Sequence, residues 1–197
     1  MNDKISLAIT IIIAAVMLMK RLNLLETFDG EVTRVLSTVD DRKYLVRNLP
    51  DKKMAADKLA LINGKIRRFI STLDAHSEHV DIVNRIKTRF NGEITESRPD
   101  SRYTSFTENK GSKISLCIRD GQTRTPRITD DDNTMFFVTL HEVAHIASVS
   151  TGHTQEFWDT FRYLLKFAIQ HGFYRYVPYH KQPQHYCGTL IADTPLH

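Results

Sequence analysis

The stretch His141-Glu142-Val143-Ala144-His145 has the form H-E-x-x-H, and the pair Gly152-His153 follows it closely. On a helix, residues four positions apart lie one turn apart on the same face, so both histidines of the stretch can reach one metal ion. Three imidazoles and one carboxylate at these spacings are typical of zinc hydrolases. The sequence therefore predicts a Zn²⁺ site with His141, His145 and His153 as its ligands.

Glu142 is the candidate catalytic residue of this site. It is offset by about 100° from His141 around a helix, so it need not ligate the ion and can take a proton from metal-activated water. Three protein ligands plus water are typical of a catalytic zinc site, whereas four protein ligands close a structural one.

Glu156 and Asp159 are the alternative third ligands. The alternative for the whole motif is an ordinary helix whose histidines hold no metal.

The residues around the motif predict two consecutive helices. The segment 135–149 is strongly apolar, and Asp130 to Asn133 provide acidic residues and an N-cap in front of it. Ser150-Thr151-Gly152 ends this helix, and a second helix follows with its aromatic and aliphatic residues spaced to face inward. His153 is therefore expected at a rigid junction between the two helices.

Upstream of the motif, the chain mixes helical and strand patterns. Apolar residues at three- and four-residue steps predict an amphipathic helix over residues 52–73 and a further helix over residues 80–90. Two short runs, residues 103–107 and 114–118, flank a turn and predict a hairpin. A helical pattern is also expected around residues 31–39. We interpret the basic face of the first helix as solvated, with a nucleic-acid patch as the alternative.

Composition sets broad limits on the class of protein. A chain of 197 residues with 41% hydrophobic and 25% charged residues suits one globular domain with a small appended segment. The net charge of +4 permits contact with nucleic acid or an anionic membrane surface but argues for neither. Cys117 and Cys187 can pair if the fold brings them together; we expect two separate reduced thiols, as in an intracellular protein.

The N-terminal segment has the composition of a membrane segment. Residues 5–19 are apolar except for Ser6 and Thr10, and Lys20-Arg21 follow them. Such a helix spans about 22 Å, and snorkelling of the two cations extends its reach toward the roughly 30 Å hydrocarbon core. A signal peptide and a buried core helix are the alternatives. We favour an uncleaved membrane anchor over residues 1–21, with the remaining chain on the cytosolic side.

The motif and its surroundings resemble the WLM and SprT-like families of zinc metallopeptidases. In these families a buried H-E-x-x-H helix is followed by Gly-His and by an aromatic pair, here Gly152-His153 and Phe157-Trp158. The chain is similar in particular to the small WLM-like proteins of large nucleocytoplasmic DNA viruses, over roughly residues 44–195. The segments that carry this likeness are Tyr44 to Arg47, Leu116 to Asp120, Asp132 to Thr134 and Tyr186 to Gly188.

The resemblance implies an α+β, zincin-like domain over residues 44–197, with the buried motif helix and a small antiparallel sheet. In our prediction a connecting helical region over residues 22–43 and the membrane-anchor helix precede this domain. The resemblance also implies peptide-bond hydrolysis by a zinc metalloendopeptidase. A strand just before the motif helix would line the cleft and pair with the substrate backbone. The substrate-strand candidates are therefore Ser115, Cys117 and Arg119.

The tetrahedral oxyanion of peptide hydrolysis needs a hydrogen-bond donor besides zinc. Four residues with suitable side chains cluster in the tail 178–188, namely Tyr179, His180, His185 and Tyr186. Tyr186 is the candidate, and a packed or exposed loop tyrosine without a catalytic role is the alternative.

These patterns favour a membrane-anchored zinc metallopeptidase that acts on protein or peptide substrates, with Glu142 as general base and then acid. One alternative is a membrane or virion structural protein whose zinc domain is a non-catalytic interaction module for other virion proteins. Another is a DNA-associated peptidase of the DNA–protein crosslink type, since cellular members of the resembled families cleave proteins crosslinked to DNA. The expected locations are a membrane, a virion or an internal virion membrane.

Overall fold

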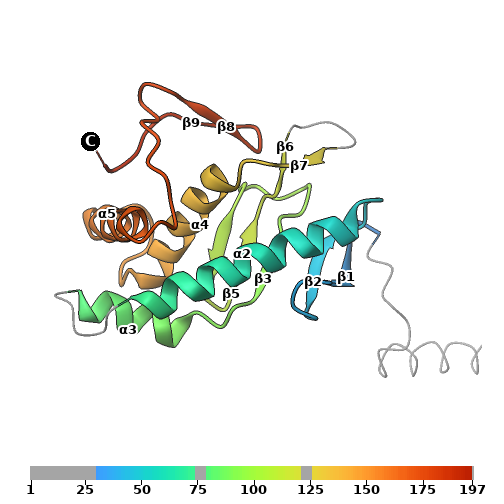
Figure 1. Ribbon diagram of the computed structural model, residues 1–197, viewed down its shortest axis with the longest axis horizontal. Coiled ribbons are helices and arrows are strands. Elements are labelled where there is room, and N and C mark those ends of the chain that lie inside the picture. Colours follow the sequence, from blue (N-terminus) through green and yellow to red (C-terminus); the bar gives the residue numbers. More distant parts are fainter. Residues whose placement is uncertain (1–29, 74–78, 121–125, 197) are drawn as a thin grey trace, which may run out of the picture. The chain divides into compact units, whose positions relative to one another are not determined.

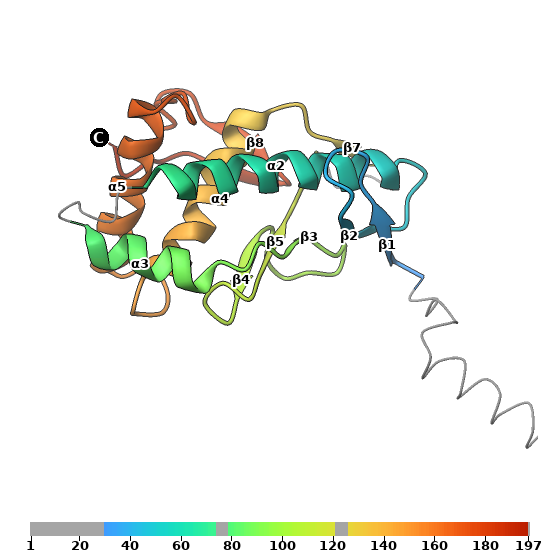
Figure 2. The ribbon, with the colours of Figure 1, turned by 60° about the horizontal axis from the view of Figure 1, so that its bottom comes forward.

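The computed structural model describes residues 30–73, 79–120 and 126–196. Figures 1 and 2 show the elements of this part of the chain in two orientations. Its helices are α2 (Lys52–Thr72), α3 (Val80–Arg89), α4 (Asp132–Ala147) and α5 (Gln155–Gln170). Its strands are β1 (Val32–Leu36), β2 (Lys43–Arg47), β3 (Ile94–Glu96), β4 (Phe106–Glu108), β5 (Lys113–Leu116), β6 (Arg119–Asp120), β7 (Arg127–Ile128), β8 (Gln184–Tyr186) and β9 (Thr189–Ile191). The α+β class is thus as predicted.

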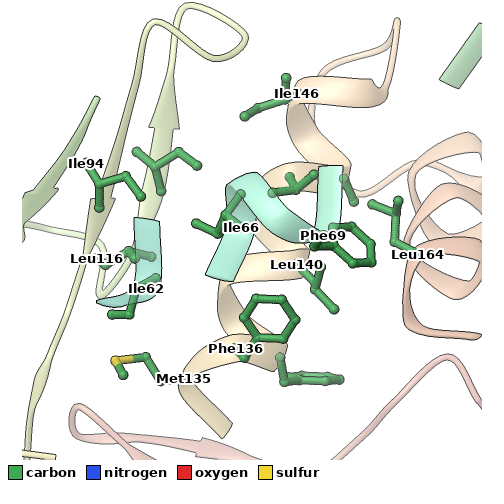
Figure 3. Close-up of a cluster of buried hydrophobic side chains, with 14 of the residues drawn as sticks. Ile62, Ile66, Phe69, Ile94, Leu116, Met135, Phe136, Leu140, Ile146 and Leu164 are labelled. Atoms are coloured by element: carbon green, nitrogen blue, oxygen red, sulfur yellow. The ribbon is translucent and has the colours of Figure 1, made fainter. Parts of the chain in front are cut away.

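The helices pack on one another through large apolar side chains. The buried face of α2 carries Ile66 and Phe69, and Phe69 meets Phe136 of α4 edge to face with ring centroids 6.1 Å apart. Figure 3 shows these side chains between α2, α4 and the strands. Burying one such side chain contributes about 1.5–3 kcal/mol relative to leaving it exposed. This cluster fixes α4, the helix that carries the histidine motif, against the rest of the domain.

A three-stranded sheet lies beside α4. Its strand order is β3-β5-β4, with β3 parallel and β4 antiparallel to the central β5. The predicted hairpin is confirmed as β4 and β5, in which Thr107 pairs with Ile114. Strand β3, which the sequence patterns did not indicate, occupies the other side of β5. As a result β4, and not β5, forms the edge of the sheet next to α4.

The predicted helix around residues 31–39, part of the connecting region 22–43, is wrong. Residues Val32–Leu36 instead form β1, which pairs antiparallel with β2 from Val32 opposite Arg47 to Leu36 opposite Lys43. The segment contains two valines and a threonine, and β-branched side chains favour strands. The remainder of the connecting region, residues 22–29, lies outside the described residues.

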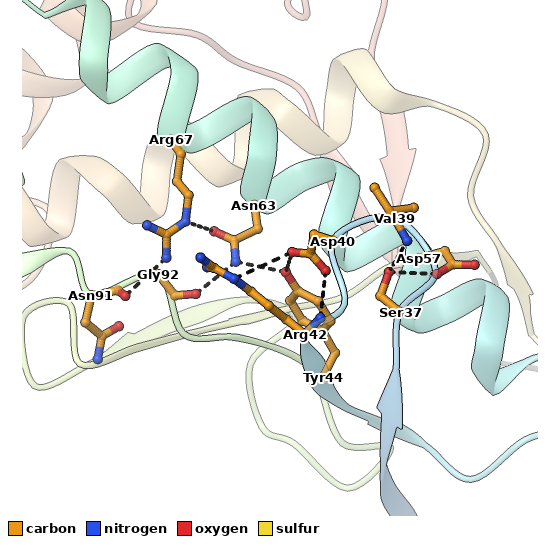
Figure 4. Close-up of polar contacts among 10 residues, drawn as sticks. All are labelled: Ser37, Val39, Asp40, Arg42, Tyr44, Asp57, Asn63, Arg67, Asn91 and Gly92. Carbon is orange, nitrogen blue, oxygen red and sulfur yellow. Dashed lines mark hydrogen bonds and ion pairs between the residues drawn. The ribbon is translucent and has the colours of Figure 1, made fainter.

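Polar contacts fasten this hairpin to α2 (Figure 4). The Tyr44 hydroxyl donates to Asp40 Oδ2 at 2.7 Å and accepts from Asn63 Nδ2 at 3.0 Å. Near the turn, the Ser37 hydroxyl donates to Asp57 Oδ1 at 2.7 Å. Buried polar groups that all find partners stabilise one arrangement of the chain. These bonds therefore stabilise the β1–β2 pairing, which the sequence pattern did not predict.

The predicted membrane anchor requires a correction. In the part of the chain that the structure describes, no helix is long and apolar enough to cross a membrane. The segment on which the prediction rested, residues 5–19, lies outside that part. For the described residues the fold class is therefore corrected to α+β with no membrane-spanning helix, and the expected membrane-anchored location is withdrawn with it.

The two cysteines also differ from expectation. Cys117 and Cys187 form a disulfide with their Cα atoms 6.3 Å apart, so the expectation of two separate reduced thiols is wrong. The bond joins the end of β5 to the β8–β9 hairpin, 70 positions further along the chain. Nothing in the local sequence around either cysteine reports a contact over that separation, because the tertiary fold creates it.

Candidate metal centre

The three predicted histidines come together at one point. His141 and His145 lie one turn apart on α4, and His153 follows in the loop before α5. Their potential ligand atoms all lie within 4.8 Å of one another, and the Nε2 atoms of His141 and His153 are 3.0 Å apart. Two nitrogen ligands of a tetrahedral zinc ion lie about 3.3 Å apart when each Zn–N bond is about 2.0–2.1 Å. The cluster can therefore hold one metal ion.

Burial keeps the imidazoles of His141 and His145 in the form that binds metal. It lowers the pKa of His141 to about 3, and the nearby His145 and His153 lower it further in the same direction. It also lowers the pKa of His145 to about 4, again with a contribution from His153. A neutral imidazole has a free lone pair on one nitrogen, whereas the protonated ring has none. Both rings are thus ready for coordination at neutral pH.

The aromatic pair noted in the sequence lies against the ligands. The ring of Phe157 contacts all three histidine rings, with centroid distances of 4.8 Å to His141, 4.3 Å to His145 and 4.8 Å to His153. Trp158 packs beside His153 at 5.6 Å. The N-cap Thr154, whose hydroxyl accepts from the Phe157 N–H, fixes the start of α5 at this place. The first turn of α5 therefore restricts the orientations of the metal-binding rings.

Glu142 is buried next to the histidines, with 3% of its surface exposed. The hydroxyl of Thr107 in β4 donates to its Oε2 atom at 2.9 Å. Burial raises the pKa of the Glu142 carboxyl to about 7, and the hydrogen bond from Thr107 opposes this rise. A carboxyl group with a pKa near neutrality can both accept and release a proton, as general base and acid catalysis require.

Two cavities meet at these residues. One, of about 490 Å³, lies between α4, α5 and the C-terminal segment 189–195. The other, of about 430 Å³, lies between β4 and the loop 151–153. Both are lined by Ser105, His141 and Glu142. An extended ligand that occupied both cavities would cross directly over the metal centre.

The alternative third ligands have other partners. The Glu156 carboxylate accepts from the N–H of Val149 at 2.7 Å and from the N–H and hydroxyl of Ser150 at 3.0 and 2.7 Å. These hydrogen bonds lower the pKa of Glu156 to about 2 and tie the end of α4 to α5. Asp159 pairs with Arg162 at 2.7 Å. The structure thus leaves both carboxylates outside the histidine cluster.

The predicted substrate strand is not available for pairing. Ser115 lies in the central strand β5, which already has β3 and β4 as neighbours. The N–H of Cys117 already donates to the Ser105 hydroxyl at 3.2 Å, and its side chain is held in the disulfide. Arg119 pairs with Ile128 of β7, and its side chain forms ion pairs of 2.6 Å with Glu96 and Asp51. The prediction failed because strand order depends on the tertiary fold and not on the local sequence. The strand that borders the cavity of about 430 Å³ is β4.

Tyr186 lies at the site but is engaged by the main chain. It lines the same cavity as His141 and Glu142, and its hydroxyl donates to the carbonyl oxygen of Cys117. Burial raises its pKa, while a hydrogen bond with Ser105 opposes the rise. Donation to an oxyanion would require this hydroxyl to leave its carbonyl partner, so its catalytic role stays a prediction.

The neighbouring candidates of the tail lie outside the site. Tyr179 is fully buried and donates to Thr134 at 3.3 Å, and the His180 and His185 side chains are exposed. Thr107 contacts Glu142 and Phe157 contacts the three histidines, but the sequence patterns predicted a role at the site for neither residue. The position of Phe157 in the aromatic pair could have indicated its contact. The contact of Thr107 depends on the strand register, which no local pattern reports.

Comparison with known proteins gives relatives of viral origin. The chain is 35% identical over 204 residues to the uncharacterized protein R325 of Acanthamoeba polyphaga mimivirus, and the match covers 100% of both chains. The chain belongs to the family of this mimivirus protein. The chain is also similar, over a shorter stretch, to two iridoviral proteins. These are the uncharacterized proteins 136R of Invertebrate iridescent virus 6 and 042R of Invertebrate iridescent virus 3.

Each iridoviral match is 44% identical over 70 residues, which is 36% of this chain and 38% and 42% of the respective relatives. No family model matches the chain, and no solved structure matches it. The viral origin of all three relatives agrees with the expectation of a viral protein.

Proposed function

We propose that this protein is a zinc-dependent metalloendopeptidase. The observation that carries the proposal is the convergence of His141, His145 and His153 within 4.8 Å, beside the buried carboxyl of Glu142. Three nitrogen ligands that leave a coordination position open are typical of catalytic zinc sites. The likeness of the motif to the WLM and SprT-like zinc metallopeptidases supports the same activity.

Each residue of the site has a defined task in this proposal. A bound zinc ion would supply Lewis-acid activation of water and of the substrate carbonyl. Glu142 accepts a proton from the attacking water and passes it to the nitrogen of the leaving amine. Thr107 holds the carboxylate in place from β4, through its 2.9 Å hydrogen bond. Phe157 limits rotation of the three imidazole rings.

The two cavities that meet at His141 and Glu142 together form a groove, and this groove favours an extended peptide as substrate. Within the described residues, β4 pairs with β5 alone, so its other main-chain edge borders the cavity of about 430 Å³. An extended peptide can add to such an edge through main-chain hydrogen bonds. A peptide in this position would continue across Glu142 into the cavity of about 490 Å³.

Cleavage of an unfolded protein by the full chain tests the proposal, with Glu142→Gln as the decisive variant. The variant should retain zinc, because Glu142 is not a ligand, and should lose about 10³-fold in rate, since it lacks the general base. Glu93→Gln removes an exposed glutamate away from the groove and serves as the matched control with an unchanged rate. An unchanged rate in Glu142→Gln would refute the proposal.

A further inference from the structure

The larger of the two cavities next to Glu142 has a mainly apolar lining. The helices contribute Phe137, Val138, Trp158 and Phe161, and the C-terminal segment contributes Ile191 and Pro195. Trp158 is 37% exposed although it is a large aromatic residue. Pockets of this size with apolar walls and few polar groups are typical ligand sites.

The charged residues of the lining, apart from Glu142, are already engaged. Arg162 donates through Nε to the carbonyl of Pro195 at 2.8 Å and pairs with Asp159 at 2.7 Å. Asp193 accepts from the N–H of Thr194 at 2.7 Å. The lining therefore attracts an apolar group more strongly than a charged one, because burying an unpaired charge is costly.

The C-terminal wall of the cavity is fixed in place before any ligand binds. The disulfide Cys117–Cys187 anchors the β8–β9 hairpin at one end. The bond from Arg162 to Pro195, with Pro195 itself buried, anchors the segment at the other. A preformed pocket binds its ligand without the cost of ordering a loop.

We infer that this cavity binds one large apolar or aromatic side chain of the substrate, at a position next to the scissile bond, and that Ala192 sets its size. The inference rests on the proposed peptidase function and names its preferred substrate. Ala192 lines the cavity with a small, exposed side chain from the anchored wall. Burying an aromatic side chain there removes about 150–250 Å² of surface from water. An alanine at the same position of the substrate removes much less.

Trp158 provides a readout of binding that does not depend on cleavage. It is the single tryptophan of the chain and lines the cavity, so a ligand in the cavity changes its fluorescence. The full chain carrying Glu142→Gln is titrated with acetyl-Gly-Gly-Phe-Gly-Gly-amide and with the same peptide containing alanine in place of phenylalanine. The phenylalanine peptide should bind with a dissociation constant at least tenfold lower.

Three further substitutions test whether the peptide preference arises at this cavity. Ala192→Phe should fill the cavity and abolish the difference between the peptides, and Ala192→Leu should reduce it. Leu190→Phe places the same ring on an exposed position of the same hairpin outside the lining, and it should keep the full difference. Equal affinities of the two peptides, or an unchanged preference in Ala192→Phe, would overturn the inference.

Cleavage of both peptides by the wild-type chain separates this inference from the proposed function. Faster cleavage of the phenylalanine peptide, by at least tenfold in kcat/KM, supports both. Cleavage of both peptides at equal rates overturns the pocket assignment and leaves the peptidase standing. Selective binding without cleavage of either peptide or of unfolded proteins supports the pocket and removes the peptidase.

Discussion

The hydroxyl of Thr107 lies 2.9 Å from Oε2 of Glu142 and joins the edge strand β4 to the motif helix α4. The same hydroxyl lies 3.2 Å from the main-chain carbonyl of Glu142. The pairing of Thr107 with Ile114 in the β4–β5 hairpin fixes its position. The register of the sheet therefore determines where the proposed general base is held.

Thr107→Val should lower kcat by about tenfold, because the carboxylate loses a hydrogen bond of about 1–2 kcal/mol that keeps it in place. Thr107→Ser keeps a hydroxyl at the same position and should restore most of the rate. Steady-state kinetics on one peptide substrate measure both variants. A rate for Thr107→Val equal to that of the wild type would show that the contact has no part in catalysis.

Phe157→Leu should weaken zinc binding by about tenfold, since outer contacts that orient metal ligands contribute on this scale. Competition with a chromophoric chelator gives the affinity. Phe69→Leu removes a similar buried ring from α2, away from the three histidines, and is the control for general loss of packing. Both variants should lose about 1–3 kcal/mol of unfolding free energy, but only Phe157→Leu should lose zinc affinity. Equal zinc affinities would argue against the orienting role.

Reduction of the Cys117–Cys187 disulfide should destabilise the domain. The bond closes a loop of 70 positions, for which the chain-entropy relation gives about 4 kcal/mol as an upper value. Urea unfolding with and without a reducing agent measures the difference. The double variant Cys117→Ser with Cys187→Ser should be insensitive to the reducing agent. Identical unfolding of the wild type in both conditions would contradict the structural role of the bond.

Glu156→Gln should destabilise the junction between α4 and α5 by about 1 kcal/mol, a value that allows for solvent screening of this partly exposed group. The folded chain lowers the pKa of Glu156 from 4.5 to about 2. The contribution of the carboxylate is therefore complete above the unfolded pKa and disappears as the pH falls toward the folded one.

Urea unfolding of wild type and Glu156→Gln checks this pH dependence. The two should differ at about pH 7 and converge as the pH approaches about 2. A constant difference over this range would show that the charge of Glu156 contributes nothing.

The helices of this fold follow closely from local sequence. The apolar spacing predicts a helix over residues 52–73, and the structure has α2 at Lys52–Thr72. The two agree because the apolar face that the spacing defines is the face that packs into the core. The motif spacing likewise brings His141 and His145 together, since one helical turn fixes their distance. The approach of His153 depends only on the short loop between two well-predicted helices.

Long-range pairing could not be predicted in the same way. The position of β5 between β3 and β4 depends on a contact with Ile94–Glu96, a segment too short to carry a strand pattern. The Cys117–Cys187 bond and the contact of Thr107 with Glu142 depend in turn on that sheet and on the C-terminal hairpin. The substrate-strand prediction failed because it required β5 to lie at the edge of the sheet. The convergence of the three histidines does not depend on this strand order.

Zinc titration of the metal-free full chain, with cleavage of an unfolded protein followed at each addition, tests the proposed metallopeptidase most directly. Cleavage should rise from the background to a plateau at one zinc per chain, and His153→Ala should not reach it at the same zinc concentration. Full cleavage in the absence of zinc, or binding of one zinc without any cleavage, would contradict the proposed metallopeptidase.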